Sequence, residues 1–157
     1  MPPKYPQELL WKGRQLDPAF QSDELLYYRV EGFDVQGKVN VDEIRAPDTS
    51  VNRGKYSRPE HVLYASLPKY LNFKVAQFQV REIPKELHTG DGRAITFRVE
   101  HDPTIKTNEV DENYAHSEIR AFEGNERKKN ISQSVLKQYR IKLRNVMAPA
   151  ELPASSE

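Results

Sequence analysis

The sequence contains no cysteine. Disulfide bonds, thiolate metal sites and cysteine nucleophiles are therefore all excluded. It also has no apolar stretch near the length of about 20 residues that a membrane helix needs. The first six residues, Met1–Pro6, include three prolines and lack the apolar core of a signal peptide. We therefore expect a cytoplasmic protein with no membrane association.

Apolar residues are scarce and charged residues are abundant. Hydrophobic residues make up 37% of the chain and charged residues 30%, respectively below and above the usual values for globular proteins. A chain of 157 residues fits one domain with a sizeable core. We predict a thin core, with an N-terminal arm over 1–22, a single domain over 23–147 and a disordered tail over 148–157.

Charge is unevenly distributed, although the formal net charge is only +1. The segment Glu100–Glu118 is rich in acidic residues, whereas Arg127–Arg144 contains basic residues and no acid. Such asymmetry indicates either an internal electrostatic match or a basic face for an anionic ligand. The basic segment therefore either binds nucleic acid or packs on the acidic segment.

Hydrophobic periodicity predicts several strands. Leu25–Val30 is apolar and aromatic between turn residues, and Asn72–Ile83 has strand character with a phase change that indicates a bulge or a bend. Ala94–Glu100 alternates apolar and polar residues most regularly, and Tyr114–Phe122 is a further strand. We interpret the polar stretch Ala46–Lys55 as a loop.

Two helices are expected. In the first, over Ser57–Ala65, Ser57 caps the start and Glu60 closes a capping box. In the second, apolar residues recur at helical spacing from an Asn130 cap to Val146. These elements predict an α+β domain with a central, mostly antiparallel sheet, a short mid-chain helix and a basic C-terminal helix.

The segment Tyr114–Phe122 carries the first candidate chemistry. Alternate side chains of a strand share a face, so His116 and Glu118 would lie together, with Arg120 beyond them. A carboxylate that orients an imidazole makes a general acid–base pair. The alternative is an exposed face on which opposite charges pair along the sheet.

His101 lies at the end of the preceding strand. If the two strands pair antiparallel, His101 could approach His116, and one histidine could activate a nucleophile while the other protonates a leaving group. Nearby carboxylates could complete a metal site. No known ligand spacing is present, so no metal is assigned, and no cofactor is predicted.

The stretch Ser50–Arg58 is the densest group of hydrogen-bond donors. Its basic side chains Arg53, Lys55 and Arg58, with the phenol of Tyr56, could face one anion, for which phosphate is the natural candidate. Arg29 is a secondary candidate for the same ligand. The alternative is that these side chains only bond neighbouring loops.

Three blocks of the chain resemble a loosely defined set of small uncharacterised bacterial proteins. The blocks are Leu26–Arg29, the Ser-Val-Asn-Arg and Lys-Tyr-Ser-x-Pro-Glu run over Ser50–Glu60, and the His-Asp-Pro and Asn-Tyr-x-His-Ser-Glu-Ile run over His101–Ile119. The resemblance implies a shared fold and site, in a context of defence against phage or plasmids. A fainter likeness, in a tyrosine–arginine strand and the Val62–Tyr64 run, is to RES-type ADP-ribosyltransferase toxins. No catalytic residue is carried over from either.

Three hypotheses follow. The first is a toxin- or defence-type enzyme acting on RNA or a nucleotide, with His101, His116 and Glu118 as catalytic residues. The second is a non-catalytic adaptor or antitoxin-like module that binds a protein or nucleic acid. The third is a structural subunit whose charges satisfy one another. Convergence of Arg53, His101 and His116 in one cleft would favour the first, and placement of the histidines on opposite sheet faces would count against it.

Overall fold

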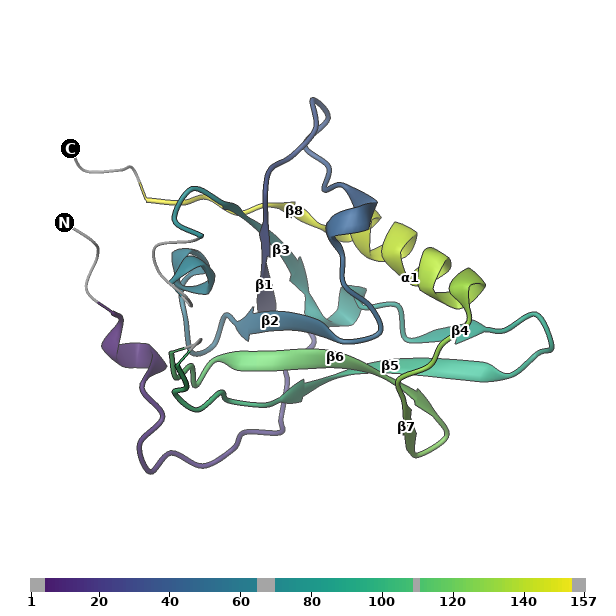
Figure 1. The fold of residues 1–157 in the computed structure, drawn as a ribbon, viewed down its shortest axis with the longest axis horizontal. Helices are drawn as coiled ribbons and strands as arrows, with labels where there is room; N and C mark the ends of the chain where they lie inside the picture. Colours follow the sequence, from purple (N-terminus) through teal and green to yellow (C-terminus); the bar gives the residue numbers. More distant parts are fainter. Residues whose placement is uncertain (1–4, 65–69, 109–110, 154–157) are drawn as a thin grey trace.

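A computed structural model describes residues 5–64, 70–108 and 111–153. It is an α+β fold, as the sequence predicts: an antiparallel sheet curved into a half-barrel, with one α-helix in the described part of the chain (Figure 1). The strands are β1 (Leu25–Val30), β2 (Thr49–Arg53), β3 (Lys74–Gln79), β4 (Glu86–His88), β5 (Ala94–His101), β6 (His116–Glu123), β7 (Glu126–Lys128) and β8 (Ala148–Pro149). The helix is α1 (Gln133–Val146), and the short 3-10 helices are η1 (Gln7–Leu9), η2 (Val41–Glu43), η3 (Pro59–Leu63) and η4 (Val80–Glu82).

The strand order in the sheet is β4-β5-β6-β2-β1-β3-β8, and β7 pairs with β6. The inner face carries the main core, where α1 packs through Tyr139 and Leu143 against the strands. The Tyr139 ring stacks on Phe97 of β5 with a centroid separation of 4.4 Å. A smaller cluster on the outer face joins Tyr27, Leu63 and Val75, so that η3 covers part of that side.

Strand β1 is buried on both faces, which explains its continuous apolar sequence. Leu26 and Tyr28 belong to the inner core, whereas Tyr27 belongs to the outer cluster. The same arrangement corrects the bulge predicted in β3. The register with β1 runs unbroken from Leu25–Gln79 to Val30–Lys74. The apolar pattern changes phase along the sequence because both faces of β3 take apolar side chains, Val75 in the outer cluster and Phe78 in the inner core.

The predicted loop over Ala46–Lys55 is wrong, since Thr49–Arg53 forms the central strand β2 between β1 and β6. Two of its polar side chains bond residues that are distant in the sequence. Asn52 accepts a hydrogen bond from Asn113 at 2.7 Å, and Thr49 bonds Tyr139 at 2.8 Å. These partners lie far away in the sequence, so local composition does not reveal the strand.

Both helix starts differ from the predictions. The mid-chain helix is the 3-10 helix η3, whose N-cap is Arg58; its backbone N–H donates to Nδ1 of His61 at 3.1 Å. The Ser57 hydroxyl instead donates to the Arg53 carbonyl at 2.6 Å, and Ala65 lies outside the described residues. Helix α1 is capped by Ser132, which accepts from the Val135 N–H, rather than by Asn130.

The ends of the domain are more ordered than predicted. Ala148 and Pro149 form β8 on β3, and the Ala150 N–H donates to the Val75 carbonyl at 2.8 Å, so the tail is not disordered from residue 148. Residues 154–157 lie outside the described residues. The N-terminal arm packs against the domain, where Leu9 is buried and its carbonyl accepts from the Tyr114 N–H.

Candidate functional site

The centre of the polar structure is Arg53, whose side chain is fully buried. Its guanidinium forms a bidentate pair with Glu24, with both N–O distances at 2.9 Å. It also donates to the carbonyls of Asp17 at 2.6 Å and Ala19 at 2.9 Å. The ring of Phe20 lies 3.8 Å beneath it. Arg53 was predicted to bind an anion, but these groups use its donors to fix the N-terminal arm to the sheet.

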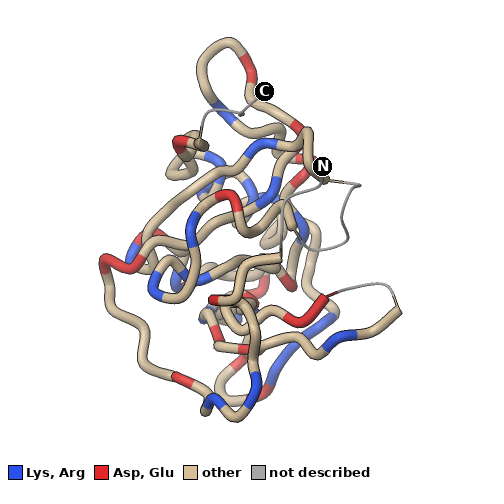
Figure 2. Tube along the Cα trace, turned by 90° about the vertical axis from the view of Figure 1, so that its left-hand side faces the viewer, with Lys and Arg blue, Asp and Glu red and all other residues tan. Residues whose placement is uncertain are grey.

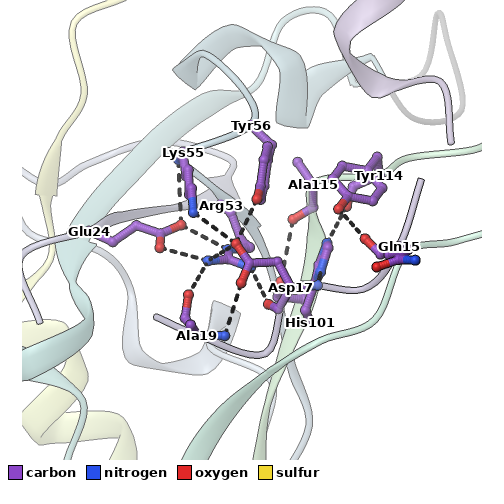
Figure 3. A network of polar contacts seen from close by, with 11 residues as sticks. Gln15, Asp17, Ala19, Glu24, Arg53, Lys55, Tyr56, His101, Tyr114 and Ala115 are labelled. Carbon is purple, nitrogen blue, oxygen red and sulfur yellow. Dashed lines mark hydrogen bonds and ion pairs between the residues drawn. The ribbon is translucent and has the colours of Figure 1, made fainter. Parts of the chain in front are cut away.

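Asp17 joins this buried pair to the protein surface (Figure 3). Its carboxylate accepts hydrogen bonds from the Lys55 ammonium at 2.9 Å and the Tyr56 phenol at 2.6 Å. The hydrogen bond from Tyr56, then that from Lys55, hold the pKa of Asp17 well below its usual range. The same contact with Asp17 raises the pKa of Lys55. Lys55 is therefore a fixed positive charge at the edge of the network.

His101 is held on both ring nitrogens. Nδ1 accepts from the Asp17 backbone N–H at 2.9 Å, and Nε2 lies 2.6 Å from the Tyr114 carbonyl oxygen. The ring stacks near Tyr56 and meets Tyr114 edge-on. Burial lowers the pKa of His101. The imidazole is neutral and both nitrogens have partners, so it acts in this network as a structural group.

His116 and Glu118 lie on the other face of the sheet. In the register of β5 and β6, His101 faces Ser117, so its side chain shares a face with Ser117 and not with His116. The predicted approach of the two histidines is therefore wrong, because their residues point to opposite sides. Nδ1 of His116 lies 2.7 Å from the Asp102 carbonyl.

Glu118 pairs with Arg120 rather than with His116. Its Oε2 accepts from Arg120 Nη2 at 2.9 Å, and Arg120 also bonds Glu100 at 3.0 Å and Asp102 at 2.5 Å. Opposite charges thus pair along this strand face, as in the alternative interpretation, but His116, Glu118 and Arg120 are half-buried rather than exposed. No group of three histidine, aspartate or glutamate side chains that could hold a metal ion occurs among the described residues.

The basic C-terminal helix does not pack on the acidic segment. Nε of Arg140 donates to the Ile44 carbonyl at 2.8 Å, and Nε of Arg144 donates to the Val39 carbonyl at 2.9 Å. A further pair joins Arg144 to Asp34 at 3.3 Å. Figure 2 shows acidic and basic segments interleaved along the tube, consistent with these local pairings. Two arginines of the predicted basic helix thus anchor the 34–44 loop on α1.

A surface hollow of about 310 Å³ collects part of the predicted donor cluster. Its lining residues are Glu8, Arg14, Gly54, Lys55, Tyr56, Ser57 and Arg58. Arg58 is 67% exposed and has one ion-pair partner, Glu60, at 3.1 Å. The Arg14 guanidinium lies 3.7 Å from the centre of the Tyr114 ring. Three positive side chains and one acid, Glu8, thus share one opening.

Arg29 does not belong to this hollow. Its guanidinium lies 3.4 Å over the ring of Tyr70, and Nη1 donates to the Val62 carbonyl at 3.4 Å. Burial lowers the pKa of Arg29. Its contacts join β1 to the outer-face segment around η3, away from Lys55 and Arg58.

Sequence reasoning did not single out Asp17, Glu24 or Arg14. Asp17-Pro18 has the signature of a turn, and Glu24 only precedes a strand. The available signal is weak: an arginine in a strand needs an acid if it is buried. It does not say which acid, because Glu24 and Arg53 are 29 positions apart.

No protein-family model, no curated protein and no solved structure matches the chain. No helix in the described part of the chain is long and apolar enough to cross a membrane.

Proposed function

We propose that the protein is a binding module that holds a phosphate-bearing ligand, a nucleotide or RNA, in the hollow formed by Arg14, Lys55, Tyr56 and Arg58. The observation that carries the proposal is the convergence of three basic side chains, from two segments distant in sequence, on one opening. Guanidinium and ammonium groups form charge-assisted hydrogen bonds with phosphate oxygens.

The rigid base of the hollow supports this function. Tyr56 and Lys55 are bonded to Asp17, and the Asp17 segment is bonded to the buried Arg53. Donors that are already positioned lose less conformational entropy when a ligand binds. Arg58 is bonded to the largely buried Glu60, but its own guanidinium is exposed, so it can reach a ligand without rearranging the buried pair of Arg53 and Glu24.

The placement of the histidines makes binding the preferred proposal over catalysis. A general acid and base must reach the same reacting atoms, but His101 and His116 point to opposite faces of the sheet. The carboxylate meant to orient His116 is bonded to Arg120. An adaptor or antitoxin-like role, in which the protein recognises a ligand without changing it, suits this geometry better.

Calorimetric titration at low salt tests the proposal with ATP, a 5′-phosphorylated ten-nucleotide RNA and unphosphorylated adenosine. We expect ATP or the RNA to bind and adenosine not to bind. Lys55→Gln and Arg58→Glu should each weaken binding about tenfold, the equivalent of one lost charge-assisted hydrogen bond. Lys142→Glu, which changes an exposed lysine on α1, should have no effect.

The two ligand arms separate a nucleotide-binding from an RNA-binding module. Absence of binding by both phosphorylated ligands, or equal weakening by Lys142→Glu, would overturn the proposal. RNA cleavage or ATP turnover that disappears in His116→Ala would instead restore the enzyme hypothesis.

A further inference from the structure

The outer edge of β5 is only half paired. β5 runs from Ala94 to His101, but β4 pairs with it only as far as Thr96. The Phe97 N–H donates to the Lys85 carbonyl at 2.9 Å, just beyond that pairing. From Arg98 onwards no described strand lies on this side of β5, whereas β6 accompanies its other side as far as His101.

The direction of the unpaired backbone groups follows from antiparallel geometry. Successive residues of such a strand turn their N–H and C=O groups alternately to one side and the other. Phe97 bonds toward β4, and Asp102 bonds toward the His116 carbonyl of β6. Val99 and His101 therefore direct their N–H and C=O groups away from β6, and no backbone bond from the described residues meets them there.

Two adjoining hollows border this edge. One, of about 520 Å³, is lined by Leu16, Pro18 and the β5 residues Arg98–His101, together with Arg120 of β6. The other, of about 440 Å³, shares Pro18, Arg98 and Val99 with it. Each is lined by β5 side chains from both sheet faces, so each lies along the strand edge. The arm segment at Leu16–Phe20 forms the opposite wall, and Leu16 is 57% exposed.

The second hollow combines an apolar base with unpaired positive charge. Its apolar lining residues are Pro18, Phe20, Val80, Ile83, Phe97 and Val99. Lys85 and Arg98 are the charged residues that line it. Neither forms an ion pair with another described residue; Arg98 lies 3.8 Å over the Phe122 ring. An apolar group next to a carboxylate would complement this surface.

We propose that the free edge of β5 binds an extended peptide of a partner protein by strand addition, with an apolar residue opposite Val99 followed directly by an acidic one opposite Arg98. The apolar residue would exchange two backbone hydrogen bonds with Val99 and share its face, toward Phe97. The acidic residue would share the face of Arg98 and pair with its guanidinium. The residue before the apolar one would face Glu100 and is expected to be polar or basic.

A second copy of this chain is the competing occupant, because β5 itself has Val99 followed by Glu100. Antiparallel pairing about Val99 would put His101 of a second copy opposite Phe97. That position is already taken, since Lys85 bonds the Phe97 N–H. A short peptide can leave the edge after the acidic residue, whereas a second β5 strand cannot. The proposal is independent of the phosphate hollow, which lies at Lys55 and Arg58.

Fluorescence anisotropy with a labelled, end-capped peptide, Ser-Ser-Thr-Lys-Leu-Glu-Ser-Ser, tests this proposal. Replacing its leucine by N-methylleucine removes one strand hydrogen bond and should weaken binding about tenfold. Arg98→Glu should weaken binding similarly and should prefer the peptide in which the glutamate is replaced by a second lysine. Lys74→Glu, at the exposed start of β3, should bind as wild type.

Hydrogen exchange gives a readout at the edge itself. In the free protein the Val99 amide should exchange fast while the Arg98 and Glu100 amides, which face β6, are protected; saturating peptide should protect Val99. Val99→Pro removes the N–H that points away from β6, so no hydrogen bond to β6 is lost. This substitution should abolish peptide binding. If it does not fold, Arg98→Glu with the lysine-substituted peptide decides the question.

Equal binding of the N-methylated and parent peptides, or an unprotected Val99 amide at saturation, would overturn the proposal. Protection of Val99 that rises with protein concentration alone, together with a doubled mass in light scattering, would also overturn it, because the occupant would be a second copy.

Discussion

The backbone N–H of Asp17 donates a hydrogen bond to Nδ1 of His101 across 2.9 Å. Since Nδ1 accepts, the ring proton is on Nε2, which donates to the Tyr114 carbonyl. Protonation of His101 would put a second donor against the Asp17 N–H. The hydrogen bond that ties the N-terminal arm to β5 therefore requires a neutral histidine.

This relationship predicts that stability falls in mild acid. Burial lowers the pKa of His101, and the Arg53 charge adds to that effect while the bond to Tyr114 opposes it. The unfolded chain then binds the proton first, so stability is intact above the ordinary histidine pKa of about 6.5 and falls as the pH drops below it, by at most about 1.4 kcal/mol per pH unit. Urea unfolding at pH 7.5 and 5.5 measures the difference.

His101→Phe is the matched variant for this measurement. It should be less stable at pH 7.5 but should lose less stability between the two pH values. The remaining loss should come largely from His61, whose pKa burial also lowers. Identical losses in wild type and variant would contradict the assignment.

The buried pair of Arg53 and Glu24 predicts a large asymmetry between single and double substitutions. Arg53→Met leaves the Glu24 carboxylate buried without its partner and frees the carbonyls of Asp17 and Ala19, so it should destabilise the fold by about 3–5 kcal/mol. Adding Glu24→Gln removes the unpaired charge and should restore part of the loss. A cost below about 1 kcal/mol for Arg53→Met would mean that the pair is solvated.

A second asymmetry is expected at Thr49 and Tyr139. The Thr49 hydroxyl donates to the Arg45 carbonyl at 2.5 Å, so the buried Tyr139 hydroxyl must donate to Thr49 Oγ1. Tyr139→Phe leaves Thr49 its bond to Arg45 and should cost about 1 kcal/mol. Thr49→Val strands the Tyr139 hydroxyl without an acceptor and should cost about 2–3 kcal/mol. Thermal or urea unfolding compares them, and the reverse order would refute the donor assignment.

The elements that were predicted from the sequence are those with a local signal. β5 has one buried and one more exposed face, so its residues alternate, and α1 repeats apolar residues at helical spacing. β1 is apolar throughout because both of its faces are covered. In each case the surroundings impose a pattern that can be read along the chain.

The elements and contacts that were missed depend on distant partners. β2 is largely polar, and its side chains at Asn52, Thr49 and Arg53 bond Asn113, Tyr139 and Glu24, which are distant in the sequence. The candidate site shows the same limit. Lys55, Tyr56 and Arg58, which were grouped because they are neighbours in the sequence, line one hollow, and Arg14 joins them only through the path of the arm. Arg53 lies outside this hollow, because its guanidinium is bonded to Glu24.

Gly54 tests how closely the hollow depends on the sheet beneath it. Its N–H donates to the Leu25 carbonyl at 2.7 Å, and a Cβ at this position would lie 2.8 Å from that carbonyl oxygen. Because the obstruction is backbone, Gly54→Ala must displace the strand end, at a cost of about 1–3 kcal/mol. It should also move the neighbouring Lys55 and weaken phosphate binding. Gly90→Ala, where a Cβ meets nothing within 4 Å, is the control for both urea unfolding and ATP titration. If Gly54→Ala is as stable as Gly90→Ala, β1 and β2 separate without strain. If Gly54→Ala is less stable but binds ATP as tightly as Gly90→Ala, the ligand lies away from Lys55.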